Sequence, residues 1–280
     1  MSEVIVADNL GFCSGVERAI ATLKEGAELS ASLGLPCYVY GDIVHNKEVM
    51  ASLAHYGIKS ILSPEDTDRP GVIVIRAHGI SDEMRLCFSS SGFRIIDATC
   101  PVVLKNQALV RDSDKDMIII GYKEHAEVIS LAGAAKREAI VIATAEELSS
   151  IDRNTQYNAV FQTTFSDSEY ERIVSRIKEQ GFKIRFLNSV CAASRMRRLS
   201  VIKLRQKVDA FVVVGDSMSA NTKELAMIAG AEGCRVFAVE KAENLPPEVF
   251  LYSRIGVTAG ASTPSVIYNK VIDILRSHNG

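Results

Sequence analysis

The strongest constraint on the fold is a unit that recurs six times along the chain: a short Val- and Ile-rich run, a small or polar turn, and a segment with helical periodicity. Examples are VIVIRAHG before SDEMRLCFSS and AFVVVGD before NTKELAMIAGA. Continuous apolar strands that alternate with helices are typical of parallel sheets covered on both faces. The sequence therefore predicts a protein of the α/β class.

Composition limits the functions open to the chain. It has 280 residues, 47% of them hydrophobic, and a net charge of -2. It therefore lacks the excess of positive charge that is typical of proteins that bind nucleic acid or an anionic membrane. No apolar run approaches the roughly 20 residues that span a bilayer, and the first residues lack the pattern of a signal peptide. We therefore expect a cytoplasmic protein with no nucleic-acid or membrane partner.

Three cysteines share one local setting and divide the chain evenly. Cys13, Cys100 and Cys191 each follow a strand-like run and open a helix-like segment, at spacings of 87 and 91 residues. These turns predict three similar α/β subdomains of about 90 residues, near the lower end of ordinary domain size. We place them at 14–97, 98–190 and 191–280.

The same three cysteines favour a metal centre. The partial positive charge at a helix N-terminus favours the thiolate, which is the form that binds metal. A structural zinc site usually has four ligands with close C-x-x-C pairs, and the sequence has no such pair. Three thiolates with one position left open suit a 4Fe-4S cluster whose fourth iron is able to bind a substrate. The other cysteines lie within apolar runs and are expected to be core residues: Cys37, Cys87 and Cys234.

Polar side chains follow several of the predicted strands. Three histidines, His45, His78 and His125, lie at strand ends, where ligands bind in open parallel sheets, and Glu127 follows closely. Hydroxyl and amide groups occupy similar positions and are able to bind phosphate at helix N-termini, although each alone is an ordinary helix cap. They are Gln162, Thr163, Thr164, Ser217, Ser219, Asn221 and Ser262.

Taken in order, these motifs resemble one family: 4-hydroxy-3-methylbut-2-enyl diphosphate reductase, the last enzyme of the methylerythritol phosphate route to isoprenoids. The similarity covers essentially the whole chain. It runs through GFCSGV, GDIVHN, AHG, DATCP, HAEV, QTT, the third cysteine, SMSAN and VTAGAS.

The resemblance implies a fold and a cofactor. Three α/β subdomains would form a pseudo-threefold trefoil around one central 4Fe-4S cluster, bound by Cys13, Cys100 and Cys191. Residues 1–13 would complete the third subdomain and carry Cys13 to the middle.

The resemblance also implies a reaction. The open iron would take the C4 hydroxyl of the substrate, Glu127 would protonate the departing hydroxyl, and Thr163 would orient the proton relay together with His125. A reduced ferredoxin or flavodoxin would supply two electrons, and the products would be isopentenyl and dimethylallyl diphosphate. The expected diphosphate ligands are His45, His78, His125, Ser219, Asn221 and Ser262.

The chain also departs from the usual pattern of this family. Ala126 stands where the family has proline, and Ile129 and Ser130 replace an acidic–glycine pair; Met218 and Ala220 replace an asparagine and a serine of the phosphate loop. These changes keep open a divergent paralogue that acts on another allylic diphosphate. The cluster itself leaves two further alternatives: a hydratase or dehydratase that uses it without an electron donor, and a non-catalytic sensor of iron or oxygen.

Overall fold

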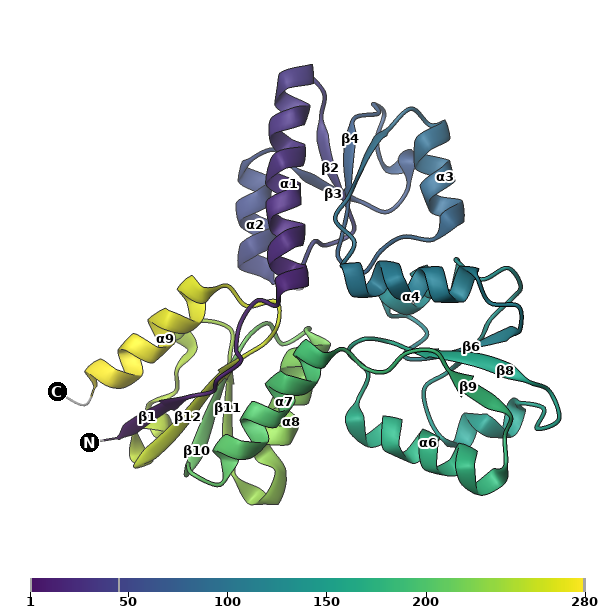
Figure 1. Cartoon of the computed structure of the whole chain (residues 1–280). Helices are drawn as coiled ribbons and strands as arrows, with labels where there is room; N and C mark the ends of the chain where they lie inside the picture. Colours follow the sequence, from purple (N-terminus) through teal and green to yellow (C-terminus); the bar gives the residue numbers. More distant parts are fainter. Residues whose placement is uncertain (1, 45, 279–280) are drawn as a thin grey trace. The chain divides into compact units, whose positions relative to one another are not determined.

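The computed structural model describes residues 2–44 and 46–278, which contain twelve strands and nine α-helices (Figure 1). The strands form three four-stranded sheets, and every strand pair in them is parallel. The predicted α/β class is confirmed. The chain separates into two compact units: unit 1 (Met1–Glu17, Val44–Leu53 and Ala192–Gly280) and unit 2 (Arg18–Ile43 and Ala54–Cys191). The subdomain limits at residues 14, 98 and 191 stay a prediction.

Unit 1 contains one sheet, which joins the two ends of the chain. Its strand order is β1 (Glu3–Val6), β12 (Arg254–Ala259), β10 (Ala210–Val214) and β11 (Arg235–Val239). Helix α9 (Ser265–Ser277) packs on one face, whereas α7 (Ala192–Arg205) and α8 (Ala220–Gly230) pack on the other.

Strand β10 shows why this sheet is covered on both sides. All five of its residues are apolar and buried, and successive side chains point to opposite faces. Val212 and Val214 pack with α9, whereas Phe211 and Val213 pack with α7 and α8. An uninterrupted apolar strand therefore requires helices on both faces, as the sequence pattern predicted.

The first sheet of unit 2 has the order β3 (Lys59–Ile61), β2 (Cys37–Tyr40), β4 (Val72–Ile75) and β5 (Arg94–Asp97). Helix α3 (Asp82–Ser90) packs on one face through Phe88. Helix α1 (Ser14–Leu33) lies on the other, where a Cβ at Gly26 would stand 2.6 Å from Cγ2 of Val74. Helix α2 (Lys47–His55) follows β2 along the chain.

The second sheet of unit 2 has the order β7 (Ile140–Ile142), β6 (Asp116–Ile120), β8 (Tyr157–Phe161) and β9 (Ile184–Phe186). Helices α4 (Pro101–Arg111) and α5 (Ala126–Ala132) pack on one face, and α6 (Asp167–Gln180) packs on the other. Because β6 and β8 are parallel neighbours, the loops that follow them emerge at the same edge of the sheet.

Short 3-10 helices complete the described elements: Pro64–Asp66, Glu146–Ser150, Ala231–Gly233, Ala242–Asn244 and Pro247–Leu251. Among the described residues, none of the helices combines the length and the apolar character needed to cross a bilayer.

A buried ion pair joins α7 to α8 in unit 1. The side chain of Arg198 is only 1% exposed, and its Nη1 lies 3.0 Å from Oε1 of Glu224, whose side chain is 12% exposed. Removing one partner of such a pair leaves the other charge poorly solvated inside the protein.

We expect Arg198→Met to lower the free energy of unfolding by about 3 kcal/mol, because the buried carboxylate of Glu224 would lose its ion pair with Arg198. Adding Glu224→Leu should recover most of that loss. The exposed pair of Arg254 and Asp209 is the control, and Arg254→Met should cost less than about 1 kcal/mol. Urea denaturation measures all three, and equal losses at the buried and exposed pairs would contradict the prediction.

Candidate active site

The centre of the candidate site is a buried carboxyl group at the strand ends of the second sheet in unit 2. Glu127 lies in the first turn of α5, beyond the carboxyl end of β6, and is 0% exposed. Thr163 follows β8. Its backbone N donates to Oε1 of Glu127 at 2.8 Å, and its Oγ1 donates to Oε2 at 2.6 Å. Each carboxyl oxygen therefore has one partner from the neighbouring loop.

A glycine at the end of β6 allows α5 to approach this closely. A Cβ at Gly121 would lie 2.6 Å from Cγ2 of Val128 and 2.8 Å from Cβ of Gln162. Any larger residue would push α5 away from the loop after β8. The contact between Glu127 and Thr163 thus requires a residue without a side chain, glycine, at position 121.

Burial changes the acidity of Glu127. Desolvation raises the pKa of its carboxyl group from 4.5 to about 7, against the two hydrogen bonds from Thr163, which lower it. The group is therefore able to carry a proton near neutral pH, as a general acid must. Perturbed pKa values of this kind cluster at functional sites.

This raised pKa predicts a pH-dependent cost to stability. Below about pH 4.5 Glu127 is protonated in both the folded and the unfolded protein, and no cost arises. Between about pH 4.5 and 7 the unfolded state ionises Glu127 whereas the folded state keeps it protonated, so the folded state loses stability across this window and the loss is complete above about pH 7.

We therefore expect the stability of the protein relative to Glu127→Gln to fall by roughly 2–3 kcal/mol between about pH 5 and pH 8. Urea denaturation of both proteins across this range measures the difference. Parallel pH profiles would show that Glu127 titrates alike in the folded and unfolded states.

Two of the predicted histidines meet at the start of α5, the helix that carries Glu127. His125 is the N-cap of α5, and its Nδ1 accepts a hydrogen bond from the backbone N of Glu127 at 3.2 Å. The ring of His78, from the loop after β4, meets the ring of His125 edge-on at a centroid distance of 5.1 Å. The third histidine, His45, lies outside the described residues.

Ser130 connects α5 to the loop after β4 and was not among the predicted site residues. It is 1% exposed, and its Oγ lies 2.8 Å from the backbone O of His78 and 2.9 Å from that of Glu127. The sequence marked Ser130 only as a departure from the family pattern and not as a link to His78, because a serine inside a short helix usually bonds only to its own helix.

Two of the predicted cysteine ligands adjoin the same residues. The backbone N of Cys191 donates to the O of Thr163 at 2.8 Å, and that of Cys100 donates to the O of Ala77, next to His78, at 3.0 Å. Both cysteines directly precede a helix, α7 and α4 respectively, and both are partly exposed. Unit 2 therefore brings Cys100, His78, His125, Glu127, Thr163 and Cys191 to one set of strand-end loops.

Unit 1 contains the remaining predicted site residues. Ser219 caps α8, and Ser262, from the loop after β12, places its Oγ 3.4 Å from that of Ser219. Asn221 accepts a hydrogen bond from the backbone N of Ala261 at 2.8 Å through Oδ1. The loops after β10 and β12 are thus joined at the carboxyl ends of two neighbouring strands.

The segment that carries Cys13 lies beside these loops. The backbone N of Gly11 donates to the O of Ala259 at 3.2 Å, and Nη2 of Arg197 donates to the O of Gly11 at 2.7 Å. Cys13 directly precedes α1. Hydrogen bonds from the buried Arg197 and to the end of β12 therefore fix Gly11, two residues before Cys13.

Asp216 is a further residue of this region that sequence analysis did not identify. It is 5% exposed; its Oδ1 accepts from the backbone N of Met218 at 2.8 Å, and its Oδ2 accepts from that of Lys47 at 3.3 Å. The link to Lys47 spans 169 positions in the sequence, so only the folded chain reveals it.

The cysteines differ in the way that metal binding requires. In the described part of the chain none of the six cysteines forms a disulfide, and each of the three predicted ligands stands at the start of a helix. By contrast, Cys37 lies in β2, where burial raises the pKa of its thiol to about 11 and opposes thiolate formation. The donor chemistry of Cys13, Cys100 and Cys191 thus suits a thiolate-bound cluster.

Cys13 belongs to unit 1, whereas Cys100 and Cys191 belong to unit 2. Within the residues that the structure describes, no three His, Cys, Asp or Glu side chains are grouped so as to hold a metal ion.

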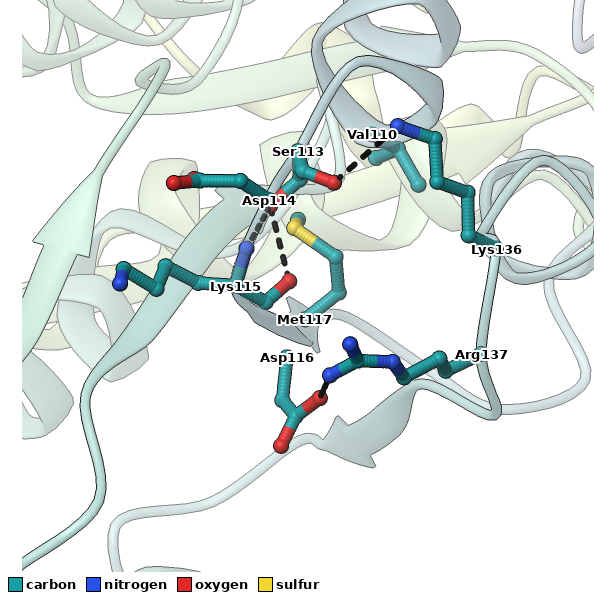
Figure 2. Close-up of a pocket in the computed structure, with 8 residues that line it drawn as sticks. All are labelled: Val110, Ser113, Asp114, Lys115, Asp116, Met117, Lys136 and Arg137. Atoms are coloured by element: carbon teal, nitrogen blue, oxygen red, sulfur yellow. Dashed lines mark hydrogen bonds and ion pairs between the residues drawn. The ribbon is translucent and has the colours of Figure 1, made fainter.

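A separate pocket of about 230 Å³ lies at the opposite edge of the second sheet (Figure 2). It borders Asp116, the first residue of β6, and Asp116 pairs there with Arg137 at 2.7 Å. Ligands of parallel sheets bind at the carboxyl ends of strands, and Glu127 lies at that end of β6. We therefore do not assign a catalytic role to this pocket.

Known proteins resemble the chain along its whole length. A family model described as LytB protein matches residues 4–276. A 4-hydroxy-3-methylbut-2-enyl diphosphate reductase from Treponema denticola is 38% identical, over 95% of this chain and 96% of that protein. The protein of the same name from Aquifex aeolicus is 32% identical, over 97% and 95% respectively.

Solved structures agree with these matches. The E-1-hydroxy-2-methyl-but-2-enyl-4-diphosphate reductase from Plasmodium falciparum has a TM-score of 0.90 and 29% identity, over 98% of this chain and 87% of that one. A structure described as (E)-4-hydroxy-3-methyl-but-2-enyl diphosphate reductase, the terminal enzyme of the non-mevalonate pathway, has a TM-score of 0.73 and 30% identity, over 99% and 100%.

The fold and the full-length similarity place the chain among α/β reductases. It belongs to the LytB family. The family predicted from the sequence motifs is therefore confirmed.

Proposed function

We propose that this chain removes the C4 hydroxyl of (E)-4-hydroxy-3-methylbut-2-enyl diphosphate by reduction and forms isopentenyl and dimethylallyl diphosphate. The observation that carries the proposal is the buried Glu127, held by two hydrogen bonds from Thr163 and with a pKa of about 7. The names of relatives matched over nearly their full length support this substrate. The reaction uses two electrons and two protons, breaks one C–O bond, forms one C–H bond and releases water.

We assign one 4Fe-4S cluster per chain to Cys13, Cys100 and Cys191. LytB proteins are iron–sulfur enzymes, and these three cysteines share one setting at the start of a helix and form no disulfide. When bound, the cluster supplies electrons and a Lewis-acidic iron for the C4 oxygen. Described cysteines that form no disulfide suit a reducing compartment, and we therefore place the enzyme in the cytoplasm.

Glu127 is the proton donor in this proposal. Its protonated carboxyl group gives a proton to the departing hydroxyl, which then leaves as water. Thr163 holds both carboxyl oxygens and so orients the proton toward the substrate. His125 caps the helix that carries Glu127 and fixes its first turn.

Two sets of residues are assigned to the diphosphate. In unit 2 they are His78 and His125, whose rings are 5.1 Å apart. In unit 1 they are Ser219, Asn221 and Ser262 at the start of α8 and in the loop after β12, where backbone N–H groups and the helix dipole favour an anion. His45 joins this set on the basis of the sequence motif alone.

A reduced ferredoxin or flavodoxin is the proposed electron donor. The reaction requires two electrons, and both kinds of protein carry one electron at a time. Two encounters with a one-electron carrier would thus complete each turnover.

An anaerobic assay with reconstituted protein, dithionite-reduced methyl viologen and the proposed substrate tests this function. Glu127→Gln should reduce kcat by at least about 100-fold with an unchanged cluster absorption spectrum, because only the proton donor is lost. Cys100→Ser should lose both the spectrum and the activity. Cys87→Ser, a change of a half-buried helical cysteine, should keep both.

Two outcomes would redirect the proposal. No turnover with an intact cluster would indicate a different allylic diphosphate, and the exposed Met218 beside Ser219 would be the first position to change. Turnover without any reductant would indicate hydration or dehydration instead.

The pH profile provides a separate test of Glu127 as the acid. Activity should decline as pH rises above about 7, because the donor loses its proton. Thr163→Val removes a hydrogen bond that lowers the pKa of Glu127, so the midpoint of this decline should move to higher pH. A midpoint that stays in place or falls would assign the decline to another group.

A further inference from the structure

Helix α7 presents an exposed apolar row directly after Cys191. Met196, Leu199 and Ile202 are 51%, 39% and 39% exposed, and their spacing of three residues puts them on one side of the helix. The opposite side, with Val201 and Leu204, is buried against the sheet of unit 1. The exposed row is therefore not needed for the core that α7 forms.

Positive charges border this row. Residues 192–207 contain six Arg and Lys residues and no Asp or Glu, although the whole chain has a net charge of -2. Arg195, Lys203 and Lys207 are exposed. Within the described part of the chain these three form none of the ion pairs that neutralise other surface arginines, such as Arg172 and Arg254.

An apolar centre with a charged border is the composition of a transient protein interface. Single exposed apolar side chains are common, but three in one row beside unpaired cations are not explained by the fold. Methionine adapts readily to different partner surfaces. The cations would attract an acidic partner and speed its association. We name this surface the α7 face: Arg195, Met196, Leu199, Ile202, Lys203 and Lys207.

The position of the α7 face suggests what its partner delivers. Helix α7 starts at Ala192, next to the proposed cluster ligand Cys191. Met196 is five residues beyond Cys191, which corresponds to about 7.5 Å along a helix axis. A protein docked on the first turns of α7 would stand close to that thiolate.

We propose that the α7 face is the docking surface for an acidic protein electron carrier. The inference rests on the proposed function, because it assumes a cluster at Cys191 that must be reduced. Each docking event transfers one electron from the reduced carrier, which leaves oxidised. Two events supply the electron pair that, with two protons, converts the substrate into product and water.

The test compares a protein donor with a small one. In the double variant Arg195→Glu, Lys203→Glu, the KM for an acidic reduced 2Fe-2S ferredoxin should rise at least about tenfold. The kcat with dithionite-reduced methyl viologen should stay within about twofold of wild type, because that donor needs no docking surface. The matched control is Lys24→Glu, Lys178→Glu, which reverses two exposed helical charges elsewhere and should leave both values unchanged.

A binding measurement separates failure of the docking surface from failure of the proposed function. Calorimetry of the holoenzyme with oxidised ferredoxin should show affinity weakened at least about tenfold in the α7 double variant only. If the wild-type protein failed to convert the substrate with reduced viologen, the proposed function would be wrong. Calorimetry would still show whether ferredoxin binds to the α7 face.

Several results would overturn the docking surface. They are equal ferredoxin affinity in wild type and the α7 variant, an equal loss in the control variant, or a parallel loss of viologen turnover. Sedimentation velocity could also overturn the proposal. If the wild-type protein were a dimer and the α7 variant a monomer, the α7 face would be a contact between two copies of the chain.

Discussion

The contact between Glu127 and Thr163 is the constraint on which the candidate site depends. It exists because β6 and β8 are parallel neighbours whose following loops share one edge of the sheet, and because Gly121 lets α5 approach. The contact buries the carboxyl group, and burial raises its pKa to about 7. Acidity and position therefore arise from the same packing.

The same edge geometry recurs in the other two sheets, where the remaining candidate residues also follow the carboxyl ends of strands. His78 follows β4, the residues around Ser219 follow β10, and Ser262 follows β12. Backbone hydrogen bonds then connect Cys191 to Thr163 and Cys100 to Ala77. A fold built from one repeated strand–helix unit thus presents thiols, imidazoles, hydroxyls and an acid at strand ends.

Much of this was predictable because its signals are local. Val- and Ile-rich runs before helical segments indicated the parallel sheets, and cysteines at matching turns indicated the candidate ligands. Other features had no local signal. Ser130 bonds to His78 across 52 positions, Asp216 to Lys47 across 169, and the buried Arg198 to Glu224 on α8 across 26.

The sequence by itself determined the α/β class, the family and the identities of the candidate residues, because periodicity and ordered motifs are written along the chain. Only the tertiary structure decided which of those residues touch and how acidic Glu127 is. Contact and desolvation depend on packing between segments distant in sequence, such as α5 and the loop after β8, and no local pattern encodes them. For the same reason, the exposed row on α7 became visible only when the opposite side of that helix was found in the core.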